Sequence, residues 1–130
     1  MQNLLKEFTN PAELIAEFDK AKADGSFFIV YLTGGIGPEG KSWCPDCDAH
    51  RDAIKTTVLD KTELLVLKGV VDDRNTWVGV SDHPYKAHPI IKAGGVQSLT
   101  LHMGAQVMSR IDSDTDFQNE ELLKAIACPE

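Results

Sequence analysis

Seven residues, Lys41-Ser42-Trp43-Cys44-Pro45-Asp46-Cys47, contain two cysteines that are separated by two residues. Proline is tolerated at the first position of a helix, because its missing N–H leaves no bond unmade there and its φ already suits a helix. Pro45 therefore predicts that a helix begins directly after Cys44. Cys44 would be the N-cap residue and Cys47 would lie one turn inside the helix, close enough to form a disulfide with it.

The predicted helix start makes Cys44 the more reactive of the two thiols. The unpaired N–H groups and the positive end of the helix dipole stabilise a thiolate, and the pKa of a C-x-x-C thiol falls below the free value of about 8.5. Cys47 is placed to attack the mixed disulfide that Cys44 forms and to release the reduced partner. The spacing predicts a dithiol–disulfide oxidoreductase with Cys44 as nucleophile and Cys47 as resolving thiol.

Composition narrows the class of protein. A chain of 130 residues, 42% of them hydrophobic, is expected to form one domain over residues 1–130. The net charge, 13 − 20 = −7, disfavours nucleic acid and anionic membranes as partners. Three cysteines are too few for a disulfide scaffold, and neither a basic leader nor an apolar run of about 18 residues is present. The chain is therefore expected to be soluble and cytoplasmic.

Apolar patterning around the cysteines predicts an α/β fold. A helix is expected from Pro11, capped by Asn10, to a stop at Gly25. Nearly unbroken apolar runs at 27–32 and 64–71 flank the cysteine helix, which continues to about Leu59, so the two strands should pair in parallel. Further expected elements are a mostly looped segment at 72–95 with a short helix at 85–92, an antiparallel hairpin from 96 to 111 and a helix at 119–127.

A second motif overlaps the first. Residues 35–42 fit the G-x-x-x-x-G-K-S pattern of a phosphate-binding loop, and a later apolar strand ends in Asp72-Asp73, where a magnesium-binding aspartate could lie. In such a loop the helix begins at the Gly-Lys-Ser itself, which would place Pro45 inside its opening turns at a cost of about 3 kcal/mol. Pro38 also removes one N–H from the loop. A flexible surface loop is the preferred interpretation, with nucleotide binding as the less favoured alternative.

The cysteine pair could instead be half of a zinc site. His50 follows Cys47 at helical spacing, but the sequence has no second C-x-x-C or Cys/His pair to complete four ligands. His83, His88 and His102 are scattered, and the lone histidines are expected at the surface. Cys128 is expected to be a bystander near the end of the last helix. The tryptophans are expected to pack, although Trp43, beside the nucleophile, can also line a docking surface.

Trp43-Cys44-Pro45-Asp46-Cys47, with the glycine-rich insert that precedes it, resembles the thioredoxin domain-containing protein 17 family of small thioredoxin-related proteins. The resemblance implies a thioredoxin-like fold, with a mixed central sheet flanked by helices. It implies a protein-disulfide reductase without a bound cofactor, which takes electrons from NADPH through thioredoxin reductase. Its substrates would be small disulfides such as cystine, or oxidised proteins, and it would act as a monomer.

One segment departs from the family pattern. Thioredoxins have a cis-proline in a Val-Pro-Thr-like stretch facing the cysteines, and here the stretch reads Val96-Gln97-Ser98-Leu99-Thr100. Ser98 is placed where the proline should be. A cis bond before a non-proline residue costs about 2.5–4 kcal/mol, so the Gln97–Ser98 bond is expected to be trans. An open approach to both sulfurs would suit a redox-inert or metal-binding module, in which two chains offer four thiolates to zinc or an iron–sulfur cluster.

The charges around the pair are also unusual for a thioredoxin. Val30-Tyr31-Leu32 supplies no buried acid beneath the disulfide, so Asp46 is the carboxylate expected nearest to it. Asp46 competes with the Cys44 thiolate for the helix dipole, whereas Lys41 favours that thiolate. Substrate-binding or tuning roles are thus predicted for Trp43, Pro45, Asp46, Lys41, Gln97 and Ser98.

Overall fold

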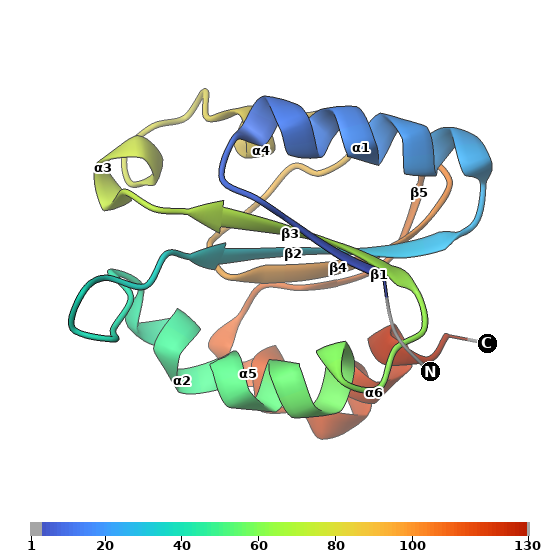
Figure 1. Cartoon of the computed structure of the whole chain (residues 1–130). Coiled ribbons are helices and arrows are strands. Elements are labelled where there is room, and N and C mark those ends of the chain that lie inside the picture. Colours follow the sequence, from blue (N-terminus) through green and yellow to red (C-terminus); the bar gives the residue numbers. More distant parts are fainter. Residues whose placement is uncertain (1–3, 130) are drawn as a thin grey trace.

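The computed structural model describes residues 4–129 and arranges five strands in one mixed sheet, in the order β1-β3-β2-β4-β5 (Figure 1). β1 and β2 each run parallel to β3, whereas β4 runs antiparallel to both β2 and β5. The predicted parallel pair and the predicted antiparallel hairpin are therefore confirmed. The strands are β1 Leu4–Phe8, β2 Phe27–Gly34, β3 Leu65–Val71, β4 Ser98–Met103 and β5 Gln106–Ile111.

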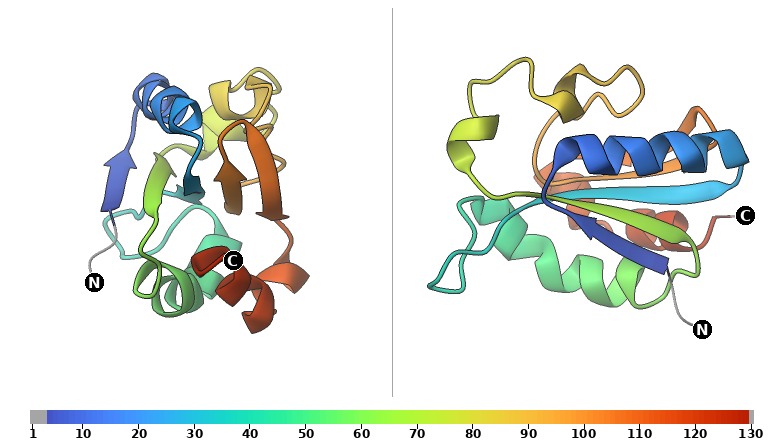
Figure 2. Two further views of the ribbon diagram at one scale, coloured as in Figure 1. Left: turned by 90° about the vertical axis from the view of Figure 1, so that its right-hand side faces the viewer. Right: turned by 45° about the horizontal axis from the view of Figure 1, so that its top comes forward.

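Helices cover both faces of the sheet, as Figure 1 and the turned views of Figure 2 show. One face carries α1 (Pro11–Asp24), α3 (Arg74–Trp77) and α4 (Pro84–Ala87). The other face carries α2 (Pro45–Ile54), its π-helical continuation η1 (Lys55–Leu59), α5 (Asp114–Phe117) and α6 (Glu120–Ala127). Each face has its own cluster of buried apolar side chains, so the sheet separates two hydrophobic cores.

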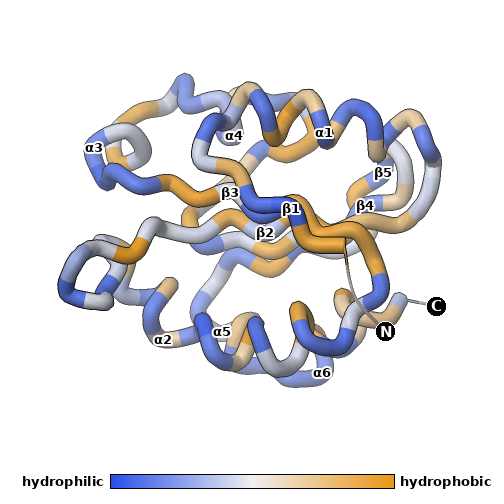
Figure 3. Tube along the Cα trace, in the orientation of Figure 1, coloured by the Kyte–Doolittle hydropathy of each residue, from blue (hydrophilic) through white to orange (hydrophobic). Residues whose placement is uncertain are grey.

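β2 is the central strand, as its sequence predicts. Seven of its eight residues are buried, because α1 covers one face and α2 with α6 covers the other. The hydropathy trace in Figure 3 shows this apolar centre between helices that are largely hydrophilic on their outer sides. Burial on both faces fixes β2 between β3 and β4 and holds its carboxyl end, at Gly34, against the start of α2.

Both long helices begin where their capping residues predict. The Asn10 side chain accepts a hydrogen bond from the Ala12 N–H at 2.9 Å, and α1 ends at Gly25 with a left-handed φ of 77°. Cys44 caps α2, and Pro45 is its first residue. The cysteine helix reaches Leu59 as expected, but its last five residues form the π-helix η1.

Other parts of the chain differ from the sequence-based expectations. β1 was not predicted. It is an edge strand that, within residues 4–129, pairs only with β3, and four of its five residues are exposed. α3 and α5 are single turns within segments that lack helical periodicity. The helix expected at 85–92 is only the turn α4. Within residues 4–129, no helix is long and apolar enough to cross a membrane.

Candidate active site

Cys44 and Cys47 form a disulfide where the carboxyl end of β2 meets the start of α2, with their Cα atoms 5.2 Å apart. The Cys47 N–H donates to Cys44 Sγ at 3.2 Å, so the sulfur caps the first turn of the helix. Cys44 is 5% exposed and Cys47 is fully buried. This is the arrangement that the sequence predicts, with the capping sulfur nearer the surface and the second sulfur beneath it.

Backbone groups of the sheet also contact the two sulfurs. The Gly34 N–H donates to Cys47 Sγ at 3.3 Å. A Cβ atom at Gly34 would lie 3.1 Å from the Cys44 Cβ and against Trp43, so only glycine allows the strand to approach this closely. The N–H groups of Gly34 and Cys47 favour negative charge on the sulfur that each contacts. The site therefore suits thiolate formation when the disulfide is reduced.

The loop that faces Cys44 corrects one sequence-based prediction. The peptide bond between Val96 and Gln97 is cis, whereas the Gln97–Ser98 bond is not. The Val96 carbonyl oxygen lies 3.4 Å from Cys44 Sγ. The prediction that Ser98 takes the place of the cis-proline is therefore wrong by one residue, because Ser98 is already the first residue of β4, opposite Leu32. Gln97 takes that place.

Gln97 ties this loop to the start of α2. Its Nε2 donates to the Asp46 carbonyl oxygen at 2.7 Å, and the residue is only 3% exposed. Its Oε1 is buried and has no hydrogen-bond partner within residues 4–129. The metal-binding alternative rested on a serine that leaves both sulfurs open to approach. That premise fails, because Val96 and Gln97 cover this side of the pair.

Trp43 holds the residue before Cys44 against the sheet. Its indole N–H donates to the Val71 carbonyl oxygen at 2.7 Å, and its half-buried ring packs on the core beneath α1. Trp77 is buried, with the Lys86 ammonium 4.4 Å from its ring centre. Both tryptophans are packing residues, as expected, and Trp43 also lies directly beside the disulfide.

The glycine-rich segment before the cysteines is a closed loop. Ile36 and Ser42 form an isolated antiparallel bridge, the Gly37 N–H donates to the Lys41 carbonyl, and the Gly40 N–H donates to the Gly37 carbonyl. These amides bond within the loop, and the helix begins at Pro45 rather than at Lys41. The geometry is not that of a phosphate-binding loop. The Lys41 side chain is exposed at its end.

Asp48 is a carboxylate of the site that sequence reasoning missed. Both of its oxygens accept from the Ser42 N–H at 3.1 Å, and one lies 2.8 Å from the Arg51 guanidinium. The hydrogen bond from Ser42, followed by Arg51, lowers the pKa of Asp48. Its i,i+3 spacing to Arg51 was the available signal. Asp46 and Pro45 are exposed, and β2 offers buried Tyr31, whose pKa is raised by burial, in place of an acid.

The histidines do not join the cysteines. His50, His83 and His102 are buried, so the expectation of surface positions is wrong for these three. His50 follows Cys47 at helical spacing, but its Nε2 lies 2.6 Å from an Asp114 carboxylate oxygen and does not bond to a sulfur. Among residues 4–129, no group of three or more His, Cys, Asp or Glu side chains is placed to hold a metal. Cys128 is exposed and unpaired at the end of α6.

Comparisons with known proteins agree with this geometry. A family model, the thioredoxin domain of thioredoxin domain-containing protein 17-like proteins, matches residues 3–128. Thioredoxin-like protein Clot of Oryza sativa subsp. japonica is 25% identical over 114 residues, 79% of this chain and 81% of that protein. Thioredoxin domain-containing protein 17 of Mus musculus is 35% identical over 75 residues, which are 56% of this chain and 54% of the mouse protein.

Solved structures establish the fold. The crystal structure of oxidised thioredoxin O1 from Arabidopsis thaliana superposes with a TM-score of 0.61 at 16% identity, covering 97% of this chain and all of that one. The predicted thioredoxin-like fold is therefore confirmed. A cysteine pair closed as a disulfide within this fold supports a general role in thiol–disulfide redox chemistry. The chain belongs to the thioredoxin domain-containing protein 17-like family of thioredoxin domains.

Proposed function

We propose that the chain is a dithiol–disulfide oxidoreductase that reduces small disulfides such as cystine and the disulfides of oxidised proteins. The observation that carries this proposal is the position of Cys44, whose sulfur caps α2 and accepts the Cys47 N–H at 3.2 Å. The N–H groups at the start of a helix stabilise a thiolate, and a thiolate is the species that attacks disulfides. Cys47 lies one turn deeper, within bonding distance of Cys44.

The proposed reaction starts from the reduced pair and proceeds in two exchanges. The Cys44 thiolate attacks one sulfur of the substrate, which forms a mixed disulfide and releases the first substrate thiol. Cys47, having given up its proton, then attacks Cys44 Sγ and releases the second substrate thiol. Two electrons pass from the dithiol to the substrate, and the Cys44–Cys47 disulfide is the oxidised product.

The oxidised pair must be reduced again before another turnover. We infer that two electrons arrive from NADPH through thioredoxin reductase, by exchange of the Cys44–Cys47 disulfide with the dithiol of that partner. The cysteines themselves carry the electrons, so this chemistry requires no resident cofactor. A cytoplasmic location and a monomeric state complete the proposal, because both suit a small acidic reductase that docks with thioredoxin reductase and with its disulfide substrates.

A coupled assay tests the proposal. NADPH oxidation is followed with thioredoxin reductase and either cystine or insulin as substrate, in the presence of the wild-type chain or a variant. Cys44→Ser is expected to reduce turnover at least a hundredfold, because the attacking thiol is absent. Cys128→Ser is the matched control and should turn over like the wild type, since Cys128 is exposed at the end of α6. Equal turnover by Cys44→Ser and the wild type would refute the proposal.

A further inference from the structure

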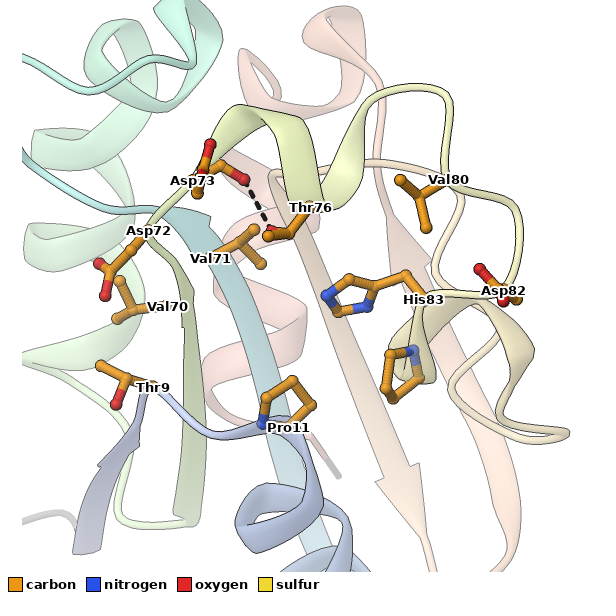
Figure 4. A pocket seen from close by; sticks show the side chains of 11 residues that line it. Thr9, Pro11, Val70, Val71, Asp72, Asp73, Thr76, Val80, Asp82 and His83 are labelled. Atoms are coloured by element: carbon orange, nitrogen blue, oxygen red, sulfur yellow. Dashed lines mark hydrogen bonds between the residues drawn. The ribbon is translucent and has the colours of Figure 1, made fainter.

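A cleft of about 510 Å³ lies at the carboxyl end of β3, between that strand and the segment around α3 and α4 (Figure 4). Its lining is mostly apolar and includes Pro11, Val71 and Val80. One hydrogen bond joins a residue that lines the cleft to a residue beside the disulfide. Val71, which lines it, accepts the indole N–H of Trp43 at 2.7 Å, and Trp43 directly precedes Cys44.

This contact places the cleft within reach of a substrate bound at the disulfide. An extended peptide spans roughly 3.3–3.6 Å per residue, so a peptide joined to Cys44 is long enough to reach past Trp43 within a few residues. Side chains of that peptide can then enter the cleft while its cysteine is exchanging with Cys44. The cleft therefore lies beside the disulfide, and neither cysteine is among its lining residues.

The rim of the cleft is negatively charged. Asp72, Asp73 and Asp82 all line it and are exposed, and no lysine or arginine is among its described lining residues. Lys86 is close by, but its ammonium donates to the Trp77 carbonyl at 2.6 Å and lies over the Trp77 ring. One oxygen of Asp73 also caps α3, where it accepts a backbone N–H at 2.8 Å. The three exposed carboxylates at the edge of this apolar hollow attract a cation and repel an anion.

A hydrogen-bond donor on a largely buried side chain points into the same cleft. His83 is only 7% exposed, and Figure 4 shows its ring directed toward Thr76 and Val71. Its Nδ1 accepts the Tyr85 N–H at 3.1 Å, and burial lowers the pKa of His83, so the neutral ring carries its proton on Nε2. Within residues 4–129, the Nε2–H has no hydrogen-bond partner. A ligand that supplies an acceptor would satisfy it.

We propose that this cleft docks cationic peptide substrates, with a lysine or arginine side chain at the Asp72, Asp73 and Asp82 rim and a backbone carbonyl accepting from His83 Nε2–H. The proposal rests on the proposed disulfide reductase function and names the substrate class of that site. It assigns the cleft to recognition of the residues near the substrate cysteine. An uncharged small disulfide would not use it.

The test compares two short peptides that carry the same disulfide and differ only in arginine or citrulline, its neutral isostere, near the cysteine. The variants are Asp72→Asn/Asp82→Asn, His83→Asn and the remote control Asp24→Asn at the end of α1. Asparagine at 83 can still cap α4 but is too short to present the donor. Bis(2-hydroxyethyl) disulfide serves as the uncharged substrate, and kcat/KM is measured for all three.

At low salt the wild type and Asp24→Asn should prefer the arginine peptide by about fivefold, as expected for one or two exposed ion pairs. In Asp72→Asn/Asp82→Asn the ratio should fall close to one. His83→Asn should slow both peptides about threefold and leave the ratio unchanged. Bis(2-hydroxyethyl) disulfide should react equally with every chain. A wild-type ratio of one, or a ratio that persists in the double variant, overturns the docking proposal. Failure to reduce any of the three substrates would instead contradict the proposed function.

Discussion

The starts of α1 and α2 are built alike, yet only one of them is placed for chemistry. Asn10 and Cys44 both cap their helices in an extended conformation, with φ of −99° and −106°, and proline follows each. The Asn10 side-chain oxygen accepts a backbone N–H at 2.9 Å, and the Cys44 sulfur accepts one at 3.2 Å. Local sequence is thus sufficient to begin a helix at either place.

The difference lies in what faces each cap. Asn10 is exposed. The Cys44 sulfur, in contrast, is bonded to the Cys47 sulfur and is covered by the loop that carries Val96 and Gln97. Gln97 bonds to the carbonyl of Asp46 in the first turn of α2. A capping motif therefore becomes a redox site only when a second segment, distant in sequence, is fixed against it.

The largest expected effect comes from replacing the amide that fixes this second segment. Gln97→Glu puts a buried carboxylate against the Asp46 carbonyl oxygen, and should lower the free energy of unfolding by about 3 kcal/mol at pH 7. Burial raises the pKa of the introduced carboxyl, so the loss should shrink as the pH falls through that raised value, because the protonated group can donate to Asp46.

Denaturant unfolding at pH 7 and pH 5, relative to the wild type, measures this effect. Gln97→Leu is the control, since it removes the hydrogen bond without adding a charge and should cost about 1 kcal/mol at both pH values. An equal loss for Gln97→Glu at the two pH values would show that the residue does not hold a buried bond to α2.

The next effect concerns the layer beneath α1. His102 on β4 is fully buried between Phe18 and Phe28, and burial lowers its pKa to about 4. Because the unfolded chain protonates near pH 6.5 and the folded chain near 4, stability should fall as the pH drops through this interval. Protonation of His102 alone should lower the free energy of unfolding by about 2 kcal/mol between pH 7 and pH 5.

His102→Gln provides the measurement of this effect. The variant retains His83 and His88, so the difference between it and the wild type isolates one histidine. Between pH 7 and pH 5 both chains should lose unfolding free energy, and the loss in the variant should be smaller than the loss in the wild type by about 2 kcal/mol. Parallel pH profiles for the two chains would mean that His102 is protonated equally in the folded and unfolded states.

The smallest expected effect separates the two caps themselves. Asn10→Ala should cost about 1 kcal/mol of stability, because one N–H of α1 loses its partner, and should leave disulfide reduction unchanged. Compared with the reduced wild type, Cys44→Ser should keep its stability and lose disulfide reduction, since serine caps helices well but is no redox thiol. Thermal unfolding and the coupled assay on both variants make the comparison. A loss of turnover in Asn10→Ala would contradict the claim that only the start of α2 takes part in disulfide reduction.

Local signals were enough to predict most of this fold. Capping residues fixed the starts of both long helices, and continuous apolar runs identified β2 and β3. β1 escaped prediction because it is a short edge strand, which gains its structure from pairing with β3 and not from its own burial pattern. The turns α3, α4 and α5 are too short for any helical period to be visible.

The cysteine side of the site was predicted correctly from the sequence, and the loop that faces the cysteines was not. The cysteine motif specified the positions of Cys44 and Cys47, because the signals that place them are adjacent in sequence. The facing loop was placed one residue out, since strand alternation alone does not show whether Gln97 or Ser98 precedes β4. The bond from Gln97 to Asp46 joins residues 51 apart, and no local pattern records it.

The most direct test of the central claim is which cysteine of the reduced protein reacts first. The reduced chain is treated with iodoacetamide at pH 6.5, where an ordinary thiol of pKa about 8.5 is almost wholly protonated, and the modified peptides are identified by mass spectrometry. Exposed Cys128 supplies the internal reference rate. Cys44 is predicted to react faster than Cys128, and Cys47 only after the chain is unfolded. Faster modification of Cys47, or a Cys44 rate no greater than that of Cys128, would contradict the assignment of Cys44 as the attacking thiol.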